Sequence, residues 1–116
     1  MNKLNSTRSH TSTQVALDFI KIEPSAGGSV VIQGIQDTRQ LLGSNIVIVE
    51  DIVDTGRTML KVISRLRHFQ PKRILIACLM RKRSRVQCYS PDYIGFEVNN
   101  SFDIFYLTSF RYLINF

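Results

Sequence analysis

Two apolar runs and the amphipathic segment between them are the clearest pattern along the chain. Asn45–Val49 and Ile74–Met80 are nearly continuous apolar stretches, which is typical of strands that are buried on both faces. The segment Thr58–Gln70 carries apolar residues at helical spacing, namely Met59, Val62, Ile63, Leu66 and Phe69. Pro71 ends this predicted helix, because proline lacks the N–H that would continue it. Strand, helix and strand together predict one right-handed crossover unit of a parallel sheet.

The residues before this unit predict two further strands. Val15–Ile22 alternates between apolar and polar positions, and Val30–Gln33 is a second short run. Glu23–Ser29 between them contains proline, glycine and serine, a composition that predicts a mobile loop. Asp37–Leu42 predicts a helical turn that Gly43 ends. The chain is therefore predicted to belong to the α/β class.

Length and composition indicate one small domain. The chain has 116 residues, of which 44% are hydrophobic, and we expect residues 1–116 to form a single domain. No apolar run reaches the roughly 20 residues that span a bilayer, and the first residues lack the apolar stretch of a secretory signal. We therefore expect a cytoplasmic location without membrane contact. The two cysteines, Cys78 and Cys88, do not make a disulfide framework.

The segment Ile46–Met59 holds the densest set of candidate chemistry. Glu50 and Asp51 follow the first apolar run, and the loop Asp54–Thr58, with the sequence DTGRT, leads into the helix. The start of a helix offers free backbone N–H groups and a favourable dipole to an anion. The two threonines add hydroxyl donors, and the glycine allows close approach. Because carboxylates suit sugar hydroxyls or a divalent cation, the pattern predicts a site for a phosphorylated sugar.

Simpler interpretations of the same residues stay open at this point. The loop would also suit an ordinary threonine-capped turn, and the two carboxylates would also suit a solvated strand end. The loop is not the P-loop of nucleoside triphosphate-binding proteins, because it lacks the first glycine at the required spacing and the Gly-Lys-Ser/Thr ending.

This segment resembles the phosphoribosyl pyrophosphate-binding motif of the purine phosphoribosyltransferases, most closely the hypoxanthine-guanine phosphoribosyltransferase family. Ala77–Arg83 resembles the family's purine-contacting strand end, Tyr89–Val98 the segment before its base-stacking aromatic, and Val15–Ile22 an upstream strand. The similarity runs roughly from Met1 to Phe102. It implies a type I phosphoribosyltransferase-like fold, Rossmann-like, with a mostly parallel sheet and flanking helices. It also implies a purine-salvage enzyme that transfers phosphoribose from phosphoribosyl pyrophosphate to hypoxanthine or guanine, giving IMP or GMP and pyrophosphate.

The resemblance assigns roles to the residues of the motif. The phosphoribosyl group would be bound by Glu50, Asp51, Asp54, Thr55, Gly56, Arg57 and Thr58. Glu50 and Asp51 would hold the ribose hydroxyls and help to organise Mg2+, the implied cofactor. Asp54 is the implied catalytic residue, a general acid/base that exchanges a proton with a purine ring nitrogen; a helix cap is the alternative role.

Three further residues carry the implied purine contacts. Lys82 resembles the lysine that contacts the exocyclic oxygen, which would select 6-oxopurines because adenine offers a donor at that position. Phe102 matches the aromatic residue that stacks on the base, and Asp103 follows it where the family usually has an aliphatic residue. The alternatives are a solvated basic loop for Lys82 and simple core packing for Phe102.

The chain also departs from the family pattern. Family members carry an N-terminal region that includes a pyrophosphate-binding loop, and nothing corresponds to it here, so we expect a partial domain that is incomplete at its N-terminus. Glu23–Ser29 is shorter than the family's closing loop and has no tyrosine. After Phe102, the segment Asp103–Phe116 drifts from the pattern. Its apolar residues are expected to expose a sticky surface.

The charge balance leaves three functions in competition. The net charge is +6, with much of the excess in Lys61–Arg73 and Arg81–Arg85; this suits a phosphorylated ligand, a nucleic acid or a solvated surface. The first function is the enzyme described above. The second is an impaired, truncated paralogue that acts as a nucleotide-binding or oligomerisation module, as a homo-oligomer or paired with a full-length homologue. Nucleic-acid binding ranks last, because no aromatic-rich recognition motif accompanies the charges.

Overall fold

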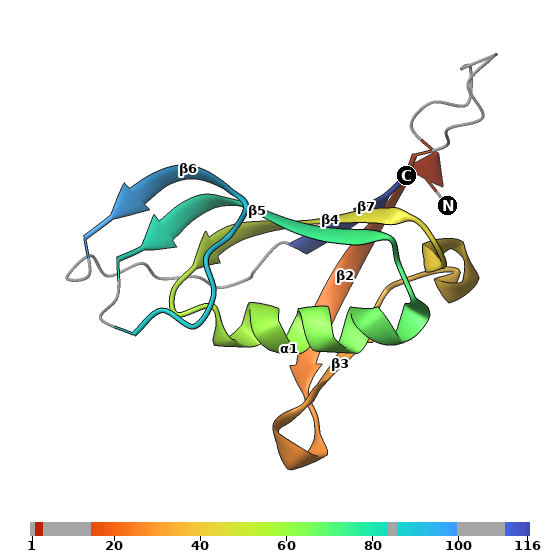
Figure 1. The fold of residues 1–116 in the computed structure, drawn as a ribbon, viewed down its shortest axis with the longest axis horizontal. Coiled ribbons are helices and arrows are strands. Elements are labelled where there is room, and N and C mark those ends of the chain that lie inside the picture. Colours follow the sequence, from red (N-terminus) through yellow and green to blue (C-terminus); the bar gives the residue numbers. More distant parts are fainter. Residues whose placement is uncertain (1, 4–14, 84–85, 100–110) are drawn as a thin grey trace.

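The described chain folds into one mixed β-sheet with an α-helix against one face (Figure 1). The computed structural model describes residues 2–3, 15–83, 86–99 and 111–116. The strands run in the order β1-β2-β7-β4-β5-β6, and β3 pairs with β2. The bounds are β1 Asn2–Lys3, β2 Ala16–Pro24, β3 Val30–Gln33, β4 Asn45–Val53, α1 Arg57–Leu66, β5 Arg73–Lys82, β6 Tyr93–Val98 and β7 Arg111–Asn115, with short 3-10 helices at Ala26–Gly28, Thr38–Leu41 and Arg67–Phe69.

The strand–helix–strand unit that the sequence predicts is confirmed in β4, α1 and β5. β4 pairs in parallel with β5, and β5 pairs in parallel with β6. β4 continues past the predicted end at Val49, because the backbone pairs Ile52 with Met80 and Val53 with Arg81. Glu50 and Asp51 therefore lie within the strand and not after it. This extension brings the motif to the carboxyl end of the parallel strands, where open α/β sheets place their ligands.

The buried face of α1 forms the core with the sheet. Met59, Val62, Ile63 and Leu66 are buried, as the helical spacing predicts. They pack in one cluster with the apolar strand residues Ile46, Ile48, Ile76, Cys78 and Leu113. The helix is shorter than predicted, since α1 ends at Leu66 and a 3-10 turn carries the chain to Gln70 in a left-handed conformation. Among the described residues, no helix is long and apolar enough to cross a membrane.

The last strand departs from the predicted mostly parallel sheet. β7 lies between β2 and β4 and pairs antiparallel with both. Leu113 is the Cα partner of Asp18 on β2 and of Ile48 on β4, and it is fully buried. Both edges of this strand are paired and Leu113 joins the core, so the expectation of a sticky surface is wrong for Leu113, but it is confirmed for Phe116, which is 43% exposed. Residues 103–110 of the same segment lie outside the described residues.

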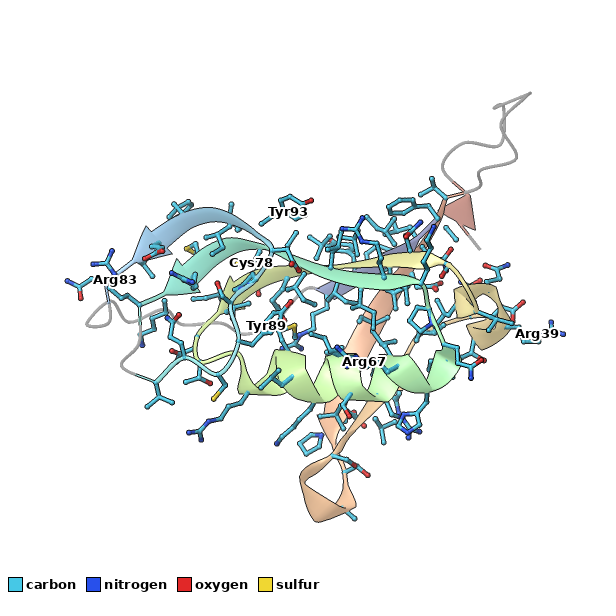
Figure 2. The ribbon with its side chains drawn as sticks, in the orientation of Figure 1. Arg39, Arg67, Cys78, Arg83, Tyr89 and Tyr93 are labelled. Carbon is cyan, nitrogen blue, oxygen red and sulfur yellow. The ribbon has the colours of Figure 1, made fainter. Side chains whose placement is uncertain are left out.

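Exposed apolar side chains gather instead on the sheet face away from α1. Figure 2 shows Tyr93 on this side of the sheet and Tyr89 on the side of α1. Phe19 and Leu79 are more than half exposed, and Phe19 packs against Tyr112 with ring centroids 5.0 Å apart. Alternation along a strand places these residues opposite the core cluster. The described part of the chain thus has a covered face that carries the core and an open apolar face.

Candidate functional site

One cavity of about 290 Å³ lies where β4 and β5 end and α1 begins. It collects seven of the predicted site residues: the motif residues Glu50, Asp54, Thr55, Gly56, Arg57 and Thr58, and the predicted purine contact Lys82. The other lining residues are Ile52, Val53, Met59 and Arg111. Asp51 does not line this cavity. Phe102 and Asp103, the predicted purine contacts, lie outside the described residues.

The loop before α1 is shaped to present backbone donors. Gly56 is the N-cap residue, in a left-handed conformation with φ 87°. The Thr55 hydroxyl oxygen accepts a hydrogen bond from the Arg57 N–H at 3.3 Å, and the Gly56 carbonyl accepts from the Leu60 N–H at 3.0 Å. The next N–H groups in the first turn have no carbonyl of their own helix to bind. They face a position where the helix dipole favours an anion.

Position 56 requires a glycine because its backbone is left-handed and because Tyr89 lies close to it. The Cys88 N–H donates to the Thr55 carbonyl at 2.8 Å, which brings Tyr89 against the loop. A Cβ on Gly56 would lie 2.6 Å from the Tyr89 carbonyl oxygen and 2.8 Å from its Cβ. The sequence motif assigns this glycine to the approach of a ligand. In the structure the segment that approaches it is residues 88–89, which the sequence does not link to the loop.

Tyr89 is itself held in place between the sheet and the N-terminal part of α1 (Figure 2). Its hydroxyl donates to the Asp92 carboxylate at 3.2 Å, and the same carboxylate oxygen accepts from the Ile76 N–H at 2.8 Å. Burial, with the neighbouring Asp92 charge, raises the pKa of Tyr89 to about 12. The tyrosine is therefore a neutral packing residue that ties β5 to the loop.

Asp54 lies at the mouth of the cavity and is exposed. It is not the N-cap residue of α1, since Gly56 has that position and its cap has no side-chain hydrogen bond. The structure therefore does not support the alternative role of Asp54 as the helix cap. Asp54 therefore lines the cavity as an exposed residue outside the helix.

Lys82 differs from its two basic neighbours. The guanidinium groups of Arg81 and Arg83 both form ion pairs with Glu97 on β6. Arg81 also donates to the Ser90 hydroxyl at 2.8 Å. Lys82 is half-buried and lines the cavity. Lys82 therefore lines the cavity, whereas Arg81 and Arg83 connect the end of β5 to β6 through Glu97.

Glu50 carries the strongest electrostatic perturbation of the cavity. Its side chain is 2% exposed, and its Oε2 accepts a hydrogen bond from the Nε of Arg111, whose side chain is 20% exposed. The two residues are Cα partners across β4 and β7. Burial and then the neighbouring Asp51 carboxyl raise the pKa of Glu50 to about 7, against the opposing effect of Arg111. This pKa lies within the range where a carboxyl exchanges protons at neutral pH.

Arg111 is the site residue that the sequence misses. It comes from the segment after Phe102 that departs from the family pattern. The available signal is a basic residue directly before the apolar run Tyr112–Ile114. That signal predicts at most a short strand, and it does not indicate that the strand would pair with β4.

The side chains at this end of β4 do not fit a magnesium ion at Glu50. One Glu50 oxygen is bound by the Arg111 guanidinium, and the other accepts from the Asp51 N–H at 3.2 Å. Asp51 lines a second cavity, which Glu50 also lines, and its Oδ1 accepts from the Ile52 N–H at 2.8 Å. A metal ion at Glu50 would have to displace the Arg111 guanidinium. Among the described residues, no group of three or more His, Cys, Asp or Glu side chains could hold a metal ion.

Comparison with known proteins shows the family of this chain. Residues 4–108 match the phosphoribosyl transferase domain. The chain is 38% identical to hypoxanthine-guanine phosphoribosyltransferase of Pan troglodytes over 109 residues, which cover 89% of this chain and 50% of that protein. It is 36% identical to phosphoribosyltransferase domain-containing protein 1 of Xenopus tropicalis over 111 residues, which cover 91% of this chain and 50% of that protein. The chain thus spans about half the length of the curated relatives it matches.

A solved structure agrees on the fold. The crystal structure of a hypoxanthine phosphoribosyltransferase from Staphylococcus aureus matches with a TM-score of 0.62 and 23% identity, over 73% of this chain and 48% of that one. The predicted type I phosphoribosyltransferase-like fold is confirmed, with a mixed rather than a mostly parallel sheet. The chain belongs to the phosphoribosyl transferase domain family.

Proposed function

We propose that the cavity binds the phosphoribosyl group of phosphoribosyl pyrophosphate or of a purine nucleotide. The observation that carries this proposal is the gathering of six motif residues and Lys82 around one cavity at the N-terminus of α1. The loop would hold the 5′-phosphate through N–H groups of the first helical turn and the hydroxyls of Thr55 and Thr58. Glu50 would accept hydrogen bonds from the ribose hydroxyls once its hydrogen bond with Arg111 is released.

The reaction we propose is purine salvage, in which hypoxanthine or guanine becomes IMP or GMP and pyrophosphate is released. The phosphate grip would fix the ribose so that the base attacks in line. Asp54 would exchange a proton with the purine ring nitrogen, and the Lys82 ammonium would donate to the exocyclic oxygen of a 6-oxopurine. Stacking by Phe102, with Asp103 beside it, is part of the proposal and comes from the resemblance alone.

The predicted cofactor and partners stay predictions for this chain. Magnesium is usually held by one or two carboxylates together with substrate phosphates, so a ligand that brings its own diphosphate could carry it without Glu50. Assembly with a second copy or with a full-length homologue, a single domain over residues 1–116 and a cytoplasmic location are likewise untested predictions.

A non-catalytic nucleotide-binding or oligomerisation module is the second candidate. One observation favours it: both carboxylate oxygens of Glu50 already accept hydrogen bonds, one from Arg111 and one from the Asp51 N–H, so this carboxylate is not free in the structure to bind the ribose hydroxyls. Such a module would bind the phosphoribosyl group without turnover. It would also pair with a longer homologue through surfaces outside the cavity.

Turnover by the purified 116-residue protein separates the two candidates. Formation of IMP and GMP from phosphoribosyl pyrophosphate, magnesium and each base is expected, and Asp54→Asn is expected to lower kcat about a hundredfold, because general acid–base catalysis typically contributes that much or more. Arg65→Gln, on the exposed side of α1, is a control for nonspecific surface effects. A folded protein that binds nucleotide but makes no product would support the module and contradict the enzyme.

A further inference from the structure

Arg111 and Glu50 form a charged pair inside the candidate site that no motif explains. Arg111 lies beyond residues 4–108, the part that matches the family. The register of β4 and β7 sets the two residues opposite each other, and the Arg111 guanidinium donates to a carboxylate that is almost fully buried. A guanidinium is always charged and is suited to buried carboxylates. The pair is therefore a built feature of the sheet and not a chance surface contact.

We propose that Arg111 is the resident counter-cation of Glu50 and takes the place that the sequence predicts for magnesium. The inference rests on the proposed function, since it concerns the same carboxylate that would hold the ribose. Both oxygens of Glu50 already accept hydrogen bonds, one from Arg111 and one from the backbone. A divalent cation would meet a fixed positive charge at this carboxylate, and like charges at such distances repel. Phosphorylated sugars would therefore bind this chain without added magnesium.

The position of Arg111 also shows where its charge can act when a ligand enters. It lines the main cavity and an adjoining cavity of about 270 Å³, which Thr58, Lys61 and Ser29 also line. The guanidinium thus stands between Glu50 and a space with a second basic side chain. Anionic oxygens of a ligand can accept hydrogen bonds from Arg111 there. Glu50 is then released to accept from the ribose hydroxyls, so that Arg111 is a positioning residue for Glu50 and a binding residue for the ligand.

The experiment compares ribose 5-phosphate binding with and without magnesium by calorimetry. For the unmodified chain, the Kd is expected to change by less than about twofold between excess magnesium and excess chelator. For Arg111→Gln, the Kd without magnesium is expected to rise roughly tenfold, the loss that one charge-assisted hydrogen bond represents, and magnesium is expected to restore part of it. Arg65→Gln, which removes a positive charge from the exposed side of α1, is expected to behave like the unmodified chain.

Magnesium binding in the absence of sugar tests the role of Arg111 independently. Titration with magnesium alone needs no sugar, and Arg111→Gln is expected to bind the ion roughly tenfold more tightly than the unmodified chain. If Arg111→Gln does not fold, the double variant Glu50→Gln with Arg111→Gln removes both charges and is expected to bind magnesium no better than the unmodified chain. Arg111→Lys keeps the charge and is expected to retain magnesium-independent sugar binding.

The outcomes distinguish this inference from the proposed function. Magnesium-dependent sugar binding by the unmodified chain, unchanged in Arg111→Gln, would overturn the role of Arg111 and leave the phosphoribosyl site intact. Absence of sugar binding in every variant would contradict the proposed function instead. In that case the magnesium titration still decides the inference, and equal magnesium affinity for the unmodified chain and Arg111→Gln would overturn it.

Discussion

Replacing Arg111 with glutamine is expected to destabilise the folded chain by about 3–5 kcal/mol, the usual cost of removing one partner of a buried ion pair. The variant leaves Glu50, with a side chain that is 2% exposed, without its counter-cation. The free energy of unfolding from urea titration measures the effect. The single variant Glu50→Gln is expected to cost less, because the remaining guanidinium is partly exposed and can turn towards water.

The double variant provides the control for this prediction. Removing both charges leaves no buried charge unpaired, so Glu50→Gln with Arg111→Gln is expected to recover most of the stability that Arg111→Gln loses. A neutral surface change such as Arg65→Gln is expected to stay within about 0.5 kcal/mol. If Arg111→Gln and the double variant lose the same stability, the pair does not interact as the structure indicates.

The stability loss of Arg111→Gln is expected to depend on pH because the pKa of Glu50 is raised. Its pKa in the folded chain is raised to about 7, above its ordinary value, so protonation favours the folded state. The contribution of Glu50 to stability is full below the ordinary pKa and is lost as the pH rises through about 7. Arg111→Gln is therefore expected to cost more at about pH 8, where Glu50 is mostly charged, than at about pH 5, where it is mostly neutral.

Gly56→Ala is expected to destabilise the chain by about 2–5 kcal/mol through two separate effects. A left-handed backbone costs a residue with a Cβ roughly 1–2 kcal/mol, and Gly56 has φ 87°. The added Cβ would also lie 2.6 Å from the Tyr89 carbonyl oxygen, and overpacking of this kind typically costs 1–3 kcal/mol. Urea unfolding measures the sum.

Gly43 offers a matched control for the backbone effect. It also has a positive φ, 68°, but a Cβ there would meet nothing within 4 Å. Gly43→Ala is therefore expected to show the backbone cost alone, and the excess in Gly56→Ala reports the contact with Tyr89. Equal losses in the two variants would mean that residues 88–89 do not press on the loop.

Local patterns were sufficient to predict the central unit of the fold. The apolar spacing of Met59, Val62, Ile63 and Leu66 fixes which face of α1 is buried, because a helix repeats every 3.6 residues. The apolar run that starts at Asn45 likewise indicates a buried strand. Its end is harder to predict, because Glu50 and Asp51 interrupt the apolar pattern while the backbone ladder with β5 continues to Val53.

The features that the sequence does not reveal depend on contacts between distant residues. Arg111 and Glu50 are 61 positions apart, and nothing in the local sequence of either shows that β7 would enter the sheet between β2 and β4. Tyr89 packs against Gly56 for the same kind of reason, through a backbone bond between Cys88 and Thr55. The motif therefore predicts the identity of many cavity residues but not the residues that hold them in position.

The charged groups that line the cavity suit the two parts of a phosphorylated sugar. The cavity is lined by the loop before α1 and by the Glu50–Arg111 pair. Arg57 and Lys82 add two further basic side chains to the lining. A phosphorylated sugar can satisfy these groups together, since its phosphate suits the loop and its hydroxyls suit a carboxylate.

An NMR titration of the chain with ribose 5-phosphate, read at the backbone amides, tests whether the cavity is a phosphoribosyl site. We predict that the amides of residues 55–59 and of Arg111 shift and saturate together, because the phosphate binds the first turn of α1 and the ribose reaches the Glu50–Arg111 pair. Saturable shifts confined to the other end of the helix, around Arg65 and His68, or no shifts at all from a folded sample, would contradict the claim that this cavity is a phosphoribosyl site.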